Sequence, residues 1–119
     1  MINMSVSIGL NPNPPSVAEF GSIGNIVSLT ETNIVSHTVS SGKVYYLTAA
    51  FGTGSSEARF FLYKNGEKID EFRMHAGERN YVRVFNSPLI FDSGTVYLKA
   101  EHQNIMSQSF VGALIGYEL

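Results

Sequence analysis

Apolar and polar side chains alternate with a period of two from residue 25 to the end of the chain, which is typical of β-strands. No window has the 3.6-residue apolar period of a helix. The alternation predicts strands at residues 25–31, 33–39, 43–51, 57–64, 67–74, 79–85, 89–91, 95–101 and 109–119. The first two could also form one long bent strand. Ser87-Pro88 is expected to interrupt pairing, because proline has no backbone N–H to donate.

The Asn65-Gly66 pair lies between two alternating segments, and this is the strongest short-range hairpin signal in the chain. It predicts a two-residue turn of type I′, in which both central residues need positive φ. The neighbouring strands must then run antiparallel.

About eight short strands separated by turns are typical of a sandwich or barrel. We therefore expect an all-β fold, an antiparallel β-sandwich of two sheets with about four strands each and a jelly-roll-like topology. Residues 43–51 and 110–119 carry apolar side chains on both faces. They are expected to be central strands, or strands with one face against a partner.

Residues 1–24 are predicted to form an extended N-terminal arm, and residues 25–119 the sandwich domain. The arm has one alternating segment, followed by a proline-rich linker that stops regular structure. Val17–Phe20 could form a single helical turn before Gly21. The candidate anchoring residues of the arm are Met4, Val6, Ile8, Leu10, Pro12, Pro14 and Pro15.

Composition excludes several classes of protein. The chain has 119 residues, no cysteine and a formal net charge of −2. It therefore has neither a disulfide framework nor a thiolate metal site, and it lacks the basic surface expected of a nucleic-acid-binding protein. The chain contains no apolar run of the roughly 20 residues that a membrane helix needs, and the N-terminus has no basic segment of a secretory signal. No nucleic-acid or membrane partner is expected.

The sequence lacks motifs for catalysis or cofactor binding, so no catalytic, metal or cofactor-binding residues are expected. The histidines are isolated, apart from the adjacent Glu101-His102, whose side chains point to opposite faces of a strand. The glycine-rich segment at residues 52–56 lacks the Lys-Ser/Thr and the helix of a phosphate-binding loop. No Gly-x-Ser-x-Gly occurs. The protein is not expected to be an enzyme.

Charged and aromatic side chains leave two interpretations open. The charges between Arg59 and Arg83 are expected to form cross-strand ion pairs, or alternatively to pair Arg59, Arg73 and Arg83 across subunits. Most phenylalanines are assigned to the core. The tyrosines that could be exposed and stack against a host glycan are Tyr45, Tyr63, Tyr81 and Tyr97.

Four segments combine Gly-rich turns with aromatic-rich strands: Gly42–Ala49, Ala58–Gly66, Gly94–His102 and Phe110–Leu119. Together they resemble the jelly-roll domains of tailed-phage decoration, head-fibre and tail-associated proteins. The resemblance covers residues 43–119 and carries no catalytic signature. It implies a homo-oligomer, with a trimer favoured, that is placed on other virion proteins such as the major capsid protein.

These expectations lead to a ranked set of functional hypotheses. The first is a non-enzymatic capsid decoration, or cement, subunit located in the virion and assembled in the host cytoplasm. The second is a receptor- or carbohydrate-binding module of a tail or fibre. A small cupin-like enzyme, which would need histidines and carboxylates clustered inside the sandwich, is the third.

Overall fold

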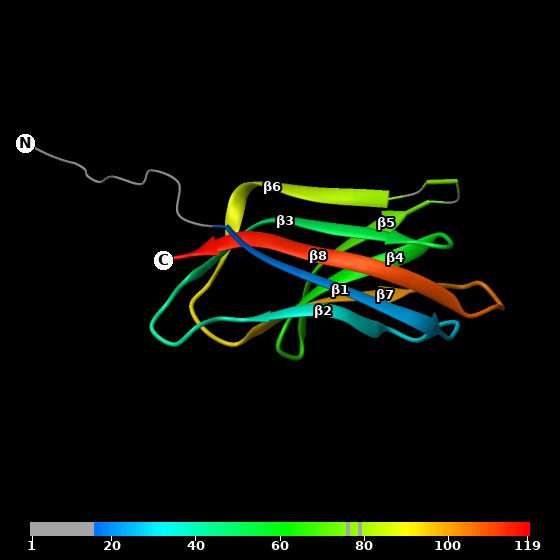
Figure 1. Ribbon diagram of the computed structural model, residues 1–119, viewed down its shortest axis with the longest axis horizontal. Coiled ribbons are helices and arrows are strands. Elements are labelled where there is room, and N and C mark those ends of the chain that lie inside the picture. Colours follow the sequence, from blue (N-terminus) through cyan, green and yellow to red (C-terminus); the bar gives the residue numbers. More distant parts are fainter. Residues whose placement is uncertain (1–15, 76, 79) are drawn as a thin grey trace, which may run out of the picture.

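The computed structural model describes residues 16–75, 77–78 and 80–119, and every regular element in this part of the chain is a β-strand (Figure 1). The strands are β1 (Ser16–Ile26), β2 (Thr32–Thr38), β3 (Tyr45–Gly54), β4 (Ala58–Lys64), β5 (Glu67–Met74), β6 (Asn80–Phe91), β7 (Thr95–Glu101) and β8 (Gln108–Glu118). The arm residues at positions 4–15 named above lie outside the described residues.

The strands form two antiparallel four-stranded sheets that pack against each other, which confirms the predicted β-sandwich. The first sheet has the order β1-β8-β3-β6 and the second the order β2-β7-β4-β5. Most connections therefore cross from one sheet to the other, and only β4 and β5 are joined as a hairpin within a sheet. This eight-strand order is that of a jelly roll.

The core lies between the sheets and is built around aromatic rings. Phe60 of β4 stacks on Phe72 of β5 at 5.5 Å between ring centroids, and it meets Phe110 of β8 edge-on at 6.0 Å. A Cβ at Gly52 would lie 2.6 Å from the ring of Phe60, so this ring fits only over a glycine. Small residues on β3 thus let large rings from the other strands fill the interior.

The predicted hairpin joins β4 to β5, with Lys64 paired to Glu67 across the Asn65-Gly66 turn. Asn65 has a φ of 53°, as predicted, but the glycines with positive φ in the described residues are Gly42, Gly77 and Gly94. The expectation of a type I′ turn is therefore wrong at Gly66. The Asn65 Oδ1 accepts a hydrogen bond of 3.1 Å from the backbone N–H of Thr95, which holds the hairpin tip against β7.

The first strand of the sandwich begins earlier than predicted. Residues 16–26 form β1, which pairs with β8 along most of its length, so the expected domain boundary between residues 24 and 25 is wrong, as is the helical turn at Val17–Phe20. Glycine obscured the pattern, since Gly21 fills an inward position where the carbonyl oxygen of Ile34 comes within 2.3 Å of an added Cβ. No side chain would fit there.

The strand β6 is continuous through Pro88, contrary to the predicted break. It lies at the edge of its sheet, where its outer side has no neighbouring strand. The pairing with β3 shifts between Ala49↔Val84 and Leu47↔Leu89, so the residues between Val84 and Leu89 bulge out of register. Proline is tolerated at such a position because its missing N–H interrupts no ladder.

Candidate functional surfaces

Tyr45 is not an exposed aromatic residue, so its assignment as a candidate glycan contact is wrong. Its side chain is fully buried in the core, between His37 at 4.1 Å and Phe91 at 6.4 Å from ring to ring. Burial, together with the nearby carboxylates of Glu19 and Glu118, raises the pKa of its phenol far above the ordinary value. Tyr45 and Tyr46 are adjacent, so side-chain alternation alone could not decide which of the two faces the core. In the structure, Tyr45 faces inward at the start of β3.

The other three candidate tyrosines divide between the core and the surface. Tyr81 is half-buried and stacks on Phe72 at 5.3 Å. Tyr63 and Tyr97 are cross-strand partners in the second sheet, on the face directed away from the core. The Tyr63 hydroxyl donates a 2.6 Å hydrogen bond to Glu31, and the Nζ of Lys99 lies 4.3 Å above its ring. One face of the Tyr63 ring is therefore already occupied by a cation.

Charged side chains cover the outer face of this second sheet and pair within the chain. Arg59 of β4 contacts Glu101 of β7 at 2.5 Å, and it lies 3.8 Å from Glu71 of β5. Phe61 points outward but is buried beneath the side chains of Arg59 and Lys68. The Nζ of Lys68 lies 4.2 Å from the centre of the Phe61 ring. The cross-strand ion pairs predicted from the sequence are present.

At the open edge between the sheets, Arg83 of β6 contacts Asp70 of β5 at 3.2 Å. Arg59 and Arg83 therefore have carboxylate partners within one chain, so the alternative of pairing across subunits is not needed to neutralise them.

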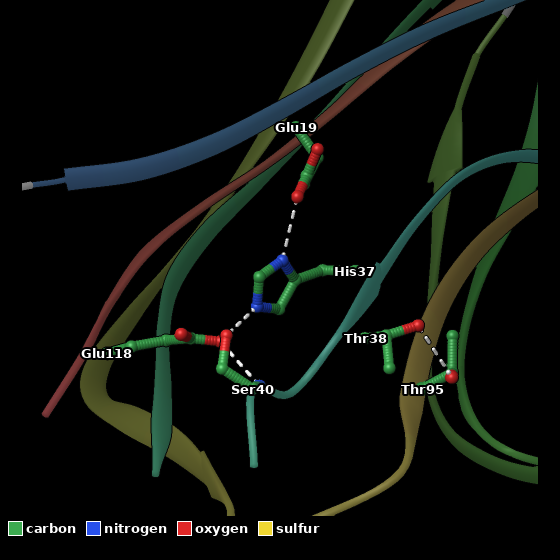
Figure 2. A network of polar contacts seen from close by, with 6 residues as sticks. All are labelled: Glu19, His37, Thr38, Ser40, Thr95 and Glu118. Atoms are coloured by element: carbon green, nitrogen blue, oxygen red, sulfur yellow. Dashed lines mark hydrogen bonds and ion pairs between the residues drawn. The ribbon is translucent and has the colours of Figure 1, made fainter. Parts of the chain in front are cut away.

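A buried histidine bridges the two sheets (Figure 2). His37 of β2 is 6% exposed, and its Nδ1 lies 2.8 Å from the Oε2 of Glu19 on β1. Its Nε2 lies 2.6 Å from the Oε2 of Glu118 on β8, and the same oxygen accepts a 3.1 Å hydrogen bond from the Ser40 N–H. Sequence reasoning missed this cluster, since its three members are widely separated along the chain and no local spacing connects them.

The cluster is a structural clamp. Each ring nitrogen of His37 lies within hydrogen-bond distance of a glutamate carboxyl oxygen, so the ring links β2 to both β1 and β8. Both nitrogens are thereby used, and the glutamates sit on opposite sides of the ring. Among the described residues, no group of three or more histidine or acidic side chains could hold a metal ion.

Substituting Glu118 by glutamine is expected to flatten the acid side of the stability profile. Partial burial alone would raise the pKa of this carboxyl, but the hydrogen bonds from Ser40 and His37 outweigh it and hold the pKa below the ordinary value of 4.5. The ionised form therefore stabilises the fold above pH 4.5, and this contribution is lost as the pH falls through the folded-state pKa.

The measurement is urea denaturation at a series of pH values from neutral to acidic. The wild type should lose stability more steeply below pH 4.5 than Glu118→Gln does, and Glu67→Gln at an exposed position should follow the wild type. Parallel profiles for the wild type and Glu118→Gln would contradict the assignment.

The other two histidines are not brought together with His37. His102 is buried, with its Nε2 2.6 Å from the carbonyl oxygen of Ile26, and its Nδ1 accepts a hydrogen bond from the Asn104 N–H. Through these contacts His102 links the end of β1 to the connection that follows β7. His75 lies exposed in the turn after β5. A shallow pocket beside His102 is lined by Arg59 and Glu101, which are already paired with each other.

The outer face of the first sheet has a different character. Its outward positions are, with few exceptions, apolar, and we call this surface the apolar face. It consists of Ala18 and Phe20 of β1, Val111, Ala113, Ile115 and Tyr117 of β8, Tyr46, Ala49 and Phe51 of β3, and Val82, Val84 and Ile90 of β6. Each alternates with an inward residue along its strand. Their neighbours Leu114 and Leu47, for example, are fully buried in the core.

The apolar face carries no charged side chain in any of its rows. The pairing register places Phe20, Ala113, Phe51 and Val82 in one row, and Ala18, Ile115, Ala49 and Val84 in the next. The row at one end contains Ser22, Val111, Thr53 and Asn80, and none of these side chains is charged.

Exposure on the apolar face is high at both edges of the sheet. Phe20 on β1 is 74% exposed, and Val84 and Ile90 on β6 are 68% and 64% exposed. Contiguous apolar surface of this kind marks an interaction site more often than free surface. The sequence pointed to this face through its doubly apolar strands, and β3 and β8 are indeed the two central strands of the first sheet.

Within the described residues, no helix is long and apolar enough to cross a membrane. No protein-family model matches the chain, and neither does any curated protein sequence.

Proposed function

We propose that this protein is a non-enzymatic structural subunit that decorates a phage capsid and works as part of an oligomer. The observation that carries the proposal is the uncharged apolar face of the sheet β1-β8-β3-β6. A single subunit in water would leave this surface exposed, so it is best explained as a surface that another protein covers.

Decoration is favoured over other assembly roles by the N-terminal segment and by the resemblance of residues 43–119. The segment alternates from Met4 to Leu10 before its prolines, as a strand donated to a neighbouring subunit would. In the proposed mechanism the arm anchors the subunit between capsid proteins. The sandwich then contributes contacts across the joints of the shell.

A non-enzymatic role is supported by how the candidate catalytic groups are used. Both buried histidines, His37 and His102, have each ring nitrogen engaged within the chain. Arg59 is ion-paired with both Glu71 and Glu101 on the outer face of the second sheet. These contacts favour a scaffold over a reactive centre.

The alternative of a carbohydrate-binding module rests on Tyr63 and Tyr97, which lie side by side on the outer face of the second sheet. A sugar stacking on the face of Tyr63 that Lys99 covers would have to displace this ammonium from the ring. That cost makes this surface a weaker candidate than the apolar face.

Removing residues 1–13 is expected to abolish binding to capsids without unfolding the sandwich, since the strands of the described sandwich begin at Ser16. The assay is co-sedimentation of the purified protein with capsids of the phage whose genome carries its gene, prepared without this protein. The full-length chain is the control, and circular dichroism checks that both fold.

Wild-type occupancy by the truncated chain would show that the arm is not the anchor. Failure of the full-length chain to bind, or a gene located outside any phage or prophage, would overturn the decoration proposal itself.

A further inference from the structure

We propose that the apolar face is closed by a second copy of this chain, packed face to face through the sheet β1-β8-β3-β6. The inference deepens the proposed function by naming the partner that covers this surface. It commits to a two-fold pair in which the same residues contribute from both copies.

Charge favours a second copy over a different partner. The apolar face has no acid or base, so it offers nothing with which to orient a charged surface. The formal charges of the central second-sheet strands lie on the opposite side of the sandwich, where Arg59, Lys99 and Glu101 project. A partner must therefore be uncharged and apolar over a matching area, and the chain itself carries such a surface.

The area is sufficient for a specific pair. Strands in a sheet are about 4.8 Å apart, and residues on one face follow each other at about 6.8 Å along a strand. A face four strands wide and four rows long therefore covers about 500 Å² in projection, so that two copies would bury about 1,000 Å² or more. Specific interfaces begin at about this size.

The shape also suits sheet-on-sheet packing. Two twisted sheets pack with their strands about 30° apart, as the two sheets of a sandwich do. The side chains that most need covering stand at both margins, with Phe20 on β1 and Val84 and Ile90 on β6. A second sheet of the same width reaches both margins at once, whereas a single added strand or helix would cover only part of the face.

The test begins with the mass of the wild-type chain in solution, measured by sedimentation over a range of micromolar concentrations. We expect a pair of copies. Val84→Glu places a charge on the apolar face at a position that is exposed in the single chain, so the fold should tolerate it. Burying that charge without a partner should weaken association at least about a hundredfold.

Phe20→Glu on the opposite margin should have the same effect, so the test survives if either variant is poorly folded. The matched control is Ile105→Glu, which replaces an apolar side chain that is 97% exposed in the connection between β7 and β8, away from the apolar face. It should associate like the wild type. Circular dichroism establishes the fold of all three variants.

A wild-type monomer would overturn the inference, as would a trimer, because three copies cannot form two-fold pairs. A pair that resists both Val84→Glu and Phe20→Glu would show that another surface joins the copies, and would also overturn it. A pair that fails to bind capsids leaves the inference standing and removes the decoration proposal. A monomer that binds capsids does the reverse.

Discussion

Substituting Gly116 by alanine is expected to lower the free energy of unfolding by about 3 kcal/mol, at the upper end for overpacked sites. A Cβ at this position would lie 2.2 Å from the carbonyl oxygen of Tyr46 and 3.0 Å from the ring of Tyr45. β8 is hydrogen-bonded on both sides, to β1 and to β3. The backbone therefore cannot move away from the added methyl group without breaking a ladder.

The measurement is equilibrium denaturation of purified Gly116→Ala beside the wild type. Gly24→Ala is the matched control, because the nearest atom to its added Cβ is the Ser109 Oγ at 3.5 Å, an ordinary contact distance. It should stay within about 0.5 kcal/mol of the wild type. If Gly116→Ala is equally mild, the close approach of β8 to β3 is not as described.

Substituting His37 by alanine is expected to cost about 2–3 kcal/mol of stability, because it empties a buried site and leaves Glu19 and Glu118 without the ring that bonds to both. The loss should be concentrated at the contact of β1 with the rest of the sandwich. Hydrogen exchange should therefore report faster opening of β1 amides than of amides in the central strand β3.

A mutant cycle separates the charge effect from the loss of packing. In a Glu19→Gln/Glu118→Gln background, His37→Ala should cost clearly less than in the wild type, since no carboxylate then loses its histidine partner. His75→Ala in an exposed turn is the control and should change stability little. Equal costs in both backgrounds would mean that His37 contributes only by filling space.

The position of β1 shows why one strand of the sandwich was misplaced. The segment from Val17 to Ile23 alternates weakly, because its inward positions hold Glu19 and Gly21 where a typical strand has large apolar residues. Glu19 faces inward at the edge strand of its sheet, where its partly exposed carboxylate meets His37 of another strand. A local pattern contains no information about such a partner.

The apolar face, too, was predicted only in part from the sequence. Apolar residues on both faces of residues 43–51 and 110–119 predicted central strands, or strands with one face against a partner, and β3 and β8 are the central strands of the first sheet. The sequence did not show that the outward positions of β1 and β6 extend the same uncharged surface. The register of four strands, set by pairings between residues far apart in the chain, was needed for that.

The sequence by itself determined the fold class, the approximate number of strands and the hairpin at Asn65-Gly66, because side-chain alternation and turn chemistry act between near neighbours. Only the tertiary structure decided which tyrosines are exposed, where β1 begins and how His37 is held between two carboxylates. These features depend on which strands become neighbours, and strand order follows from packing of the whole chain. The apolar face depends on both the sequence and the tertiary structure. Side-chain alternation indicates its residues on β3 and β8, but its full extent is set by the order of the strands in the sheet.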